Sequence, residues 1–200
     1  QNIEQDPDYT VYLMEGVRPK TWYESRAGHW IAETNWPNSL QHHTLHLQSD
    51  HRLGMNAAKL SEVVKSPQTC GAASGEYCAI WLGPEMPGDQ RGDDAFSACF
   101  TSEPLQEQMD IVGAPKLQLR LSSDKPAAQI AVRLNHIHPD GAATRITYGV
   151  LNLAHRNGHE KSEALIPGTD IDIELALDQI AYRVPKGHTI RVAISTSYWP

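Results

Sequence analysis

Residues 83–105 decide how this chain is organised, and they read Gly-Pro-Glu-Met-Pro-Gly-Asp-Gln-Arg-Gly-Asp-Asp-Ala-Phe-Ser-Ala-Cys-Phe-Thr-Ser-Glu-Pro-Leu. The first half is rich in proline, glycine and aspartate, which favour turns. The second half predicts a strand, because Phe96, Ala98 and Phe100 alternate onto one face. Glu103-Pro104 ends that strand, since proline has no N–H to donate to a sheet. The stretch is therefore a charged loop that leads into a run of strands.

Strands are expected on both sides of this stretch. Apolar and polar residues alternate in five downstream segments, which are 116–121, 130–134, 146–152, 170–177 and 190–194. A further strand at 180–184 is short and mixed, and upstream strands are expected at 9–14, 29–33 and 44–48. One wet face and one dry face are typical of antiparallel sheets. Many such strands with turns between them predict an all-β jelly-roll sandwich.

Two segments depart from the strand pattern. Residues 56–64 could form one short helix, and the alternative is a loop lying over the core. Residues 65–94 have no periodicity and predict a long irregular insertion. A loop of that length inside a compact domain is often functional or lies at an interface.

Composition and charge exclude several classes of protein. A net charge of -7 argues against a nucleic-acid partner, which would need a basic surface. No apolar run is long enough to span a membrane. The odd number of cysteines, Cys70, Cys78 and Cys99, is a poor disulfide framework for a secreted protein. We expect free buried thiols and favour a cytoplasmic location, with a Cys70–Cys78 disulfide as the alternative.

The sequence lacks the Gly-x-Ser-x-Gly motif that α/β-hydrolases need at the nucleophile. The nearest segment, Gly71-Ala-Ala-Ser74-Gly75, has the wrong spacing and no strand before it. We therefore predict that the chain itself carries no catalytic residue.

Histidines suggest metal binding at two places. On a strand His42 and His46 would share a face while His43 opposes them, so at most a pair converges. His136 and His138 also share a strand face, but no third ligand is evident in the sequence. We therefore predict no metal and no cofactor.

The acidic loop allows two binding interpretations. Arg91-Gly92-Asp93 spells an integrin-type tripeptide, which we attribute to chance. Asp89, Asp93 and Asp94 could bind calcium, although Arg91 among them would oppose a cation. We instead expect Arg91 to pair with one of these carboxylates and to fix the loop.

Aromatic residues gather at both ends of the chain, and they are Trp22, Tyr23, Trp30, Trp36, Tyr198 and Trp199. Aromatic faces of this kind can stack on sugars in a carbohydrate-binding jelly roll. We favour a place in the core or against a neighbouring domain, because a fold does not carry a function by itself.

Five segments, in order, resemble the C-terminal domain of the CocE/NonD hydrolases, the cocaine-esterase-like relatives of Xaa-Pro dipeptidyl-peptidase. They are residues 89–105, Trp30 to Pro37, Ser122-Ser123-Asp124, His138-Pro139-Asp140-Gly141, and Pro185 to Ser195. The resemblance covers about residues 9–200. It implies a galactose-binding-like sandwich in one domain, 1–200, with residues 1–8 as a linker from an α/β-hydrolase domain that precedes it.

The resemblance also implies a function. The catalytic triad of such enzymes lies in the α/β-hydrolase domain, so this domain would be non-catalytic, would pack on that domain of the same parent chain and would help to shape its cleft. The parent would be a serine hydrolase of ester or amide bonds, including Xaa-Pro peptides. Tyr182 and Arg183 are candidates to face the cleft, an ordinary hairpin tip being the alternative. A carbohydrate-binding module is the rival function, and a homo-oligomer is left open.

Overall fold

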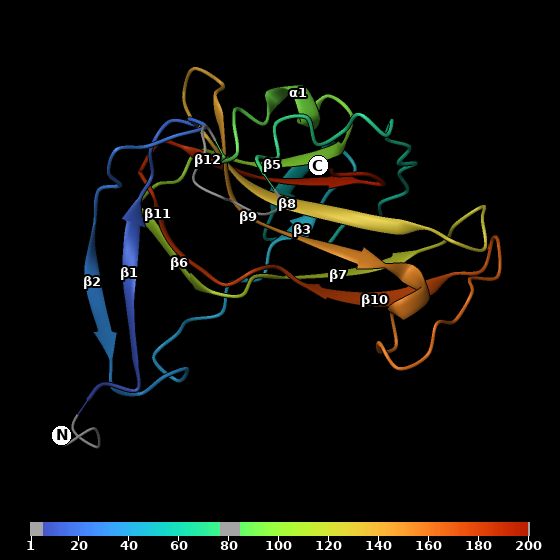
Figure 1. Ribbon diagram of the computed structural model, residues 1–200, viewed down its shortest axis with the longest axis horizontal. Helices are drawn as coiled ribbons and strands as arrows, with labels where there is room; N and C mark the ends of the chain where they lie inside the picture. Colours follow the sequence, from blue (N-terminus) through green and yellow to red (C-terminus); the bar gives the residue numbers. More distant parts are fainter. Residues whose placement is uncertain (1–5, 77–84, 200) are drawn as a thin grey trace.

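The computed structural model describes residues 6–76 and 85–199, in which layers of β-sheet pack around one apolar core (Figure 1). One layer is a six-stranded sheet, ordered β3 (His46–Leu47), β4 (Arg52–Gly54), β5 (Ala98–Ser102), β12 (Thr189–Ser195), β8 (Gln129–Ile137) and β9 (Ala143–Asn152). Its neighbouring strands are antiparallel except for the parallel pair β4 and β5. The predicted all-β sandwich is confirmed.

The opposite layer consists of two sheets joined end to end. A four-stranded sheet has the order β2 (Gly28–Glu33), β1 (Tyr9–Glu15), β11 (Ile180–Val184) and β6 (Met109–Gly113). The chain continues from β6 into β7 (Lys116–Leu121), which pairs with β10 (Ile171–Ala176). The Leu177 N–H donates to the Pro115 carbonyl at 2.8 Å and connects the two ladders. The pairing of β1 with β11 is parallel, which the alternation pattern does not predict.

The core lies between the layers and consists of the apolar faces that the sequence predicts. Phe100 and Val132 of the six-stranded sheet are almost completely buried, and Val184, Ile173 and Leu175 belong to the same core cluster from the opposite layer. Fully burying one such side chain contributes about 1.5–3 kcal/mol to folding. The leucines at 117, 119 and 121 alternate with exposed polar residues, as predicted for that strand.

The long irregular segment covers the outer face of the six-stranded sheet. In β8 every residue from Ile130 to Ile137 is buried, so both faces of this central strand are covered. The described parts of the predicted insertion, 65–76 and 85–94, contain one element, the four-residue helix α1 (Arg91–Asp94). Figure 1 shows α1 above β5 and β8. The rest of the predicted insertion, 77–84, and residues 1–5 of the predicted linker lie outside the described residues.

Several element predictions are wrong or incomplete. Residues 56–64 contain no helix, and the alternative of a loop is the one adopted, with Leu60 packed against the core. The strand expected from Phe96 begins at Ala98, and Phe96 is exposed in the turn before it. The segment 44–48 pairs only over β3. The short strands β4 and β6 were not predicted, and the 3-10 turn Leu153–His155 follows β9.

Candidate functional site

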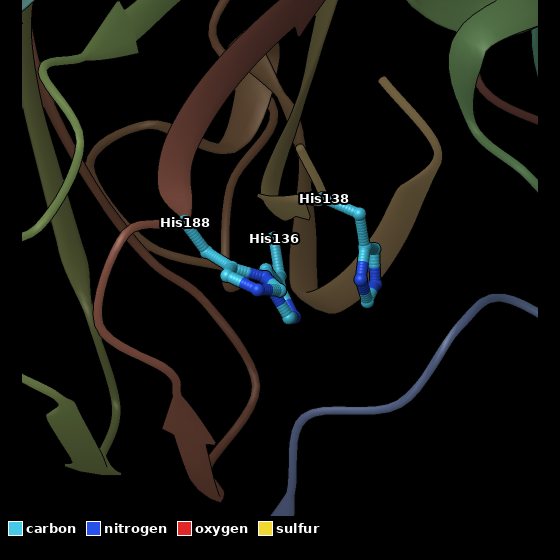
Figure 2. A group of neighbouring side chains, drawn as sticks. All are labelled: His136, His138 and His188. Carbon is cyan, nitrogen blue, oxygen red and sulfur yellow. The ribbon is translucent and has the colours of Figure 1, made fainter. Parts of the chain in front are cut away.

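Three histidines meet at one end of the sandwich. His136 and His138 lie on the same face of β8, and His188 directly precedes β12. The register that pairs Thr189 with Ile137 places His188 opposite His138 on the neighbouring strand. Figure 2 shows the His188 ring beside that of His136, with the His138 ring on the other side. One ring nitrogen from each residue lies within 4.8 Å of the other two.

The central imidazole has a hydrogen bond at each nitrogen. His136 Nε2 lies 2.6 Å from His188 Nδ1, and His136 Nδ1 lies 2.9 Å from the hydroxyl of Tyr182. Burial, with smaller contributions from His138 and His188, lowers the pKa of His136 to about 3. The ring is therefore neutral at physiological pH.

The imidazole of His138 is anchored through one nitrogen only. His138 Nε2 lies 3.2 Å from the Val17 carbonyl and 3.1 Å from the Thr144 hydroxyl. The Thr144 hydroxyl donates its own hydrogen to Val17 at 2.7 Å. Both neighbours of Nε2 are thus acceptors, so this nitrogen carries the proton and the lone pair of His138 is on Nδ1. Burial, mainly, also lowers the pKa of this ring.

The sequence predicted the pair on β8 but not the third histidine. His188 is 50 residues further along the chain, and only the antiparallel pairing of β12 with β8 brings it to the pair. The strand predicted at 190–194 was the sequence signal that could have indicated His188, because extending that strand back to residue 188 would place a histidine at the end of the sheet. His42, His43 and His46 do not join this group, and His42 and His43 are exposed.

The acidic residues of α1 serve the fold. Asp93 accepts the N–H groups of Gly71 and Ala73 at 2.8 and 3.1 Å and is only 3% exposed. The carboxylate of Asp94 binds two arginines and an asparagine of the sheet, which are Arg133, Arg191 and Asn135. Their oxygens are thus taken by N–H donors, which does not support a calcium site.

The tripeptide Arg91-Gly92-Asp93 is also poorly placed to bind an integrin-type receptor, because the side chain of Asp93 is buried. The predicted ion pair of Arg91 is confirmed, with its partner Asp89 at 2.8 Å. Hydrogen bonds from Arg91 and Ala143 hold the pKa of Asp89 below its usual value, although burial opposes them as the largest single contribution.

The two candidates for a cleft-facing role point to opposite sides of β11. Tyr182 is 1% exposed and its hydroxyl contacts His136, and a cleft-facing role for this residue stays a prediction. The alternation of side chains along a strand turns Tyr182 inward. Arg183 lies on the other face, bound to Asp110 at 2.7 Å and to Glu15 at 3.3 Å. A cleft-facing role for Arg183 stays a prediction.

The aromatic residues do not form one group. Trp22 and Trp30 are 61% and 70% exposed, so a place in the core is wrong for them. Trp36 stacks on Tyr9 with ring centroids 4.0 Å apart, and Tyr198 is buried. A hollow of about 490 Å³ lies beside the exposed Trp199, and it is lined also by Arg145, Tyr148, Asp178 and Tyr198. Arg145 there is bound to Ser74 and to Tyr198, each at 2.9 Å.

Two of the three cysteines are free thiols, as predicted. Cys70 is a buried free thiol and Cys99 a half-buried one. Burial, assisted by Asp94, raises the pKa of Cys99 to about 11. A reactive cysteine needs a lowered pKa instead. Cys78 itself lies outside the described residues.

Among residues 6–76 and 85–199, no serine or cysteine is hydrogen-bonded to a histidine. Thr144 contacts His138, but it is 5% exposed and its hydroxyl donates to a backbone carbonyl. This part of the chain therefore lacks the nucleophile and base pair that covalent hydrolysis requires. Within these described residues, the one group of three or more His, Cys, Asp or Glu side chains that could hold a metal ion is the histidine trio.

Comparison with known proteins agrees with this absence of a reaction centre. The family model described as the X-Pro dipeptidyl-peptidase C-terminal non-catalytic domain matches residues 1–200. The chain belongs to this family. Two relatives of this X-Pro dipeptidyl-peptidase C-terminal domain, from Mycobacterium bovis and Mycobacterium tuberculosis, are named as serine esterases. Each is 22% identical over 88% of this chain and 32% of its own length.

Solved structures show the same fold. An α-amino acid ester hydrolase is 19% identical with a TM-score of 0.71, and the match covers 86% of this chain and 32% of that one. A CocE/NonD family hydrolase from Staphylococcus aureus is 14% identical with a TM-score of 0.67 and is matched over all of this chain and 35% of its own. This domain of the X-Pro dipeptidyl-peptidase family thus spans about one third of the proteins that it resembles. The expected relation to CocE/NonD hydrolases is confirmed.

Proposed function

We propose that this domain packs on the α/β-hydrolase domain of a serine hydrolase polypeptide and forms part of the wall of its substrate cleft. The parent enzyme would hydrolyse an ester or amide bond through an acyl-enzyme. The family match over all 200 residues carries the proposal. The relatives named as serine esterases are about three times as long as the matched region, which leaves room for a catalytic domain.

The hairpin of β1 and β2 supports a docking role. Figure 1 shows it at the edge of the molecule, on the side where the described chain begins. Trp30 in β2 is 70% exposed, and Trp22 in the connection between β1 and β2 is 61% exposed. Large exposed aromatic side chains mark interaction surfaces. A domain that precedes this one in the polypeptide would be close enough to cover them.

Footprinting tests the docking surface directly. The intact polypeptide and the 200-residue chain are oxidised by hydroxyl radicals, and modification is read residue by residue by mass spectrometry. We expect Trp30 to be protected at least several-fold in the intact polypeptide, while Ile166, which is 72% exposed on a distant connection, serves as the control and is modified equally in both. Equal modification of Trp30 in both proteins would refute docking through the hairpin.

Enzyme kinetics test the contribution to the cleft. With p-nitrophenyl acetate, the 200-residue chain should show no saturable turnover that serine reagents block. In the intact enzyme, Trp30→Ser should raise KM or lower kcat/KM, because a loosened domain no longer completes the cleft, whereas Ile166→Ser should change neither. Serine-reagent-sensitive turnover by the 200-residue chain would contradict the assignment as non-catalytic.

A further inference from the structure

The histidine trio at the end of β8 is not explained by the family match or by domain docking. Buried polar groups persist when they are paired or bind an ion. His136 is 0% exposed and His138 is 6% exposed, while half-buried His188 closes the group from the start of β12. Three imidazoles are therefore held together at the end of the sandwich, two of them buried.

We propose that His136, His138 and His188 bind a divalent transition-metal ion, of which Zn²⁺ is the first choice. Three imidazole nitrogens with one open position are a donor set that zinc accepts. The trio offers nitrogen and no carboxylate oxygen, which selects against Ca²⁺ and Mg²⁺. The proposal replaces the prediction of no metal, because that prediction rested on the lack of a third ligand.

The hydrogen bonds around the trio specify which nitrogens face the ion. His138 holds its Nε2–H on the Val17 carbonyl and Thr144 hydroxyl, which leaves the Nδ1 lone pair free. Tyr182 can hold the Nδ1–H of His136, so that Nε2 becomes the ligand. His188 contributes Nδ1, the atom that already faces His136. Ligand histidines commonly donate their other N–H to such acceptors, which fixes the ring and its tautomer.

Small movements convert the present hydrogen bond into a coordination geometry. At zinc–nitrogen distances of about 2.0–2.1 Å, ligand atoms of a tetrahedral site are about 3.3 Å apart. His136 Nε2 and His188 Nδ1 are 2.6 Å apart and must separate. The ligand nitrogen of His138 lies within 4.8 Å of the ligand nitrogens of the other two histidines and must approach them. His188 directly precedes β12 and is only half-buried, so it is the least enclosed of the three. The ion would take the place of the proton that lies between His136 Nε2 and His188 Nδ1. His188 would then carry this proton on Nε2.

The surrounding charges are balanced. Arg18 lies close enough to lower the pKa of His138 and His188, although burial is the larger cause for both. Arg18 is itself paired with Asp140 in the turn after β8. The pair limits repulsion between the guanidinium and a bound cation. The burial that keeps the imidazoles neutral also leaves their lone pairs available for an ion.

The direct test is zinc titration of the protein after treatment with EDTA. Isothermal titration calorimetry should give one Zn²⁺ per chain, and the melting temperature should rise on zinc addition. His188→Gln should weaken binding at least tenfold and remove the rise. His43→Gln is the matched control, because it removes an exposed histidine outside the trio and should change neither. No stoichiometric binding, or binding that His188→Gln leaves intact, would overturn the proposal.

A measurement on the wild-type protein guards against a variant that does not fold. Diethyl pyrocarbonate modifies accessible imidazoles, and mass spectrometry reports each histidine separately. Zinc at one equivalent should protect His188 and leave His42 and His43 reactive. Protection of His42 and His43 with no change at His188 would instead show zinc binding to exposed surface histidines and would overturn the proposal.

Discussion

The guanidinium of Arg133, which has no exposed surface, lies 3.0 Å from the carboxylate of Asp94. Arg133 projects from the outer face of β8, whereas Asp94 is the last residue of α1. Asp94 also binds Arg191 of β12 at 3.0 Å and Asn135 of β8 at 3.0 Å. One carboxylate therefore fastens the irregular segment to two central strands of the sheet.

Replacing Asp94 by asparagine should strongly destabilise the fold. The change would leave Arg133 buried without a counter-charge, and breaking a buried ion pair in this way costs about 3–5 kcal/mol. Urea unfolding followed by circular dichroism measures the loss. Asp172→Asn, which breaks the exposed pair with Arg120, is the control and should leave the urea midpoint almost unchanged. Equal effects of the two changes would show that Asp94 does not fasten the segment.

Gly71→Ala should be more harmful than Gly141→Ala. Both glycines have a positive φ, at 117° and 87°, so alanine is strained at either position. A Cβ on Gly71 would lie 2.1 Å from the backbone nitrogen of Trp199. A Cβ on Gly141 would have no atom of the described residues within 4 Å, apart from those of its own chain neighbours. We expect a loss of about 1–2 kcal/mol from strain at Gly141 and about 2 kcal/mol more from overpacking at Gly71. Urea unfolding compares the two, and similar losses would contradict the close approach of the C-terminal segment.

Cys99 should resist alkylation in the folded protein. A pKa of about 11 in place of 9.0 lowers the thiolate fraction at pH 8 about 100-fold, and the thiolate is the species that reacts. Iodoacetamide labelling followed by peptide mass mapping compares the rate for Cys99 in the native protein with that in urea. An equally fast native reaction would mean that Cys99 is neither buried nor influenced by Asp94.

The inward faces of the strands could be predicted from the sequence, because alternation alone specifies them. Leu117, Leu119 and Leu121 show this most clearly, since the polar residues between them are exposed. The same rule fails for β8, where Arg133 and Asn135 should face solvent and are instead completely buried. They are covered by a segment without periodicity, and no local pattern indicates where such a segment packs.

The candidate site depends on contacts that are distant in sequence. His136 and His138 could be paired from the sequence because a strand has a period of two. His188 could not, because its position depends on which strand lies beside β8 and in which register. Tyr182 was expected at a cleft, and the structure places it under His136 because β11 lies in the layer opposite β8. Pairing between strands therefore determines the site, and the sequence indicates only its parts.

The neutral trio predicts how stability depends on pH. His136 keeps its pKa at about 3 in the folded protein, whereas an unfolded histidine has a pKa of about 6.5. Between these values the unfolded chain binds the proton and the folded chain does not, so acid favours unfolding. The groups that face His136 are Tyr182, His138 and His188, and none supplies a negative charge at this pH to hold a proton there.

The metal-free protein, kept in EDTA, should therefore lose stability as the pH falls below 6.5. His136 alone should remove about 2 kcal/mol by pH 5, and the loss should be fully absent above the unfolded pKa. Urea unfolding at half-unit steps from pH 7.5 to 5 measures the slope above the range in which most carboxylates titrate. His136→Gln should flatten the slope, because glutamine takes up no proton, whereas His43→Gln should leave it unchanged. A slope that is the same in all three proteins would mean that His136 can be protonated in the folded state, and the trio would then be less enclosed than its contacts imply.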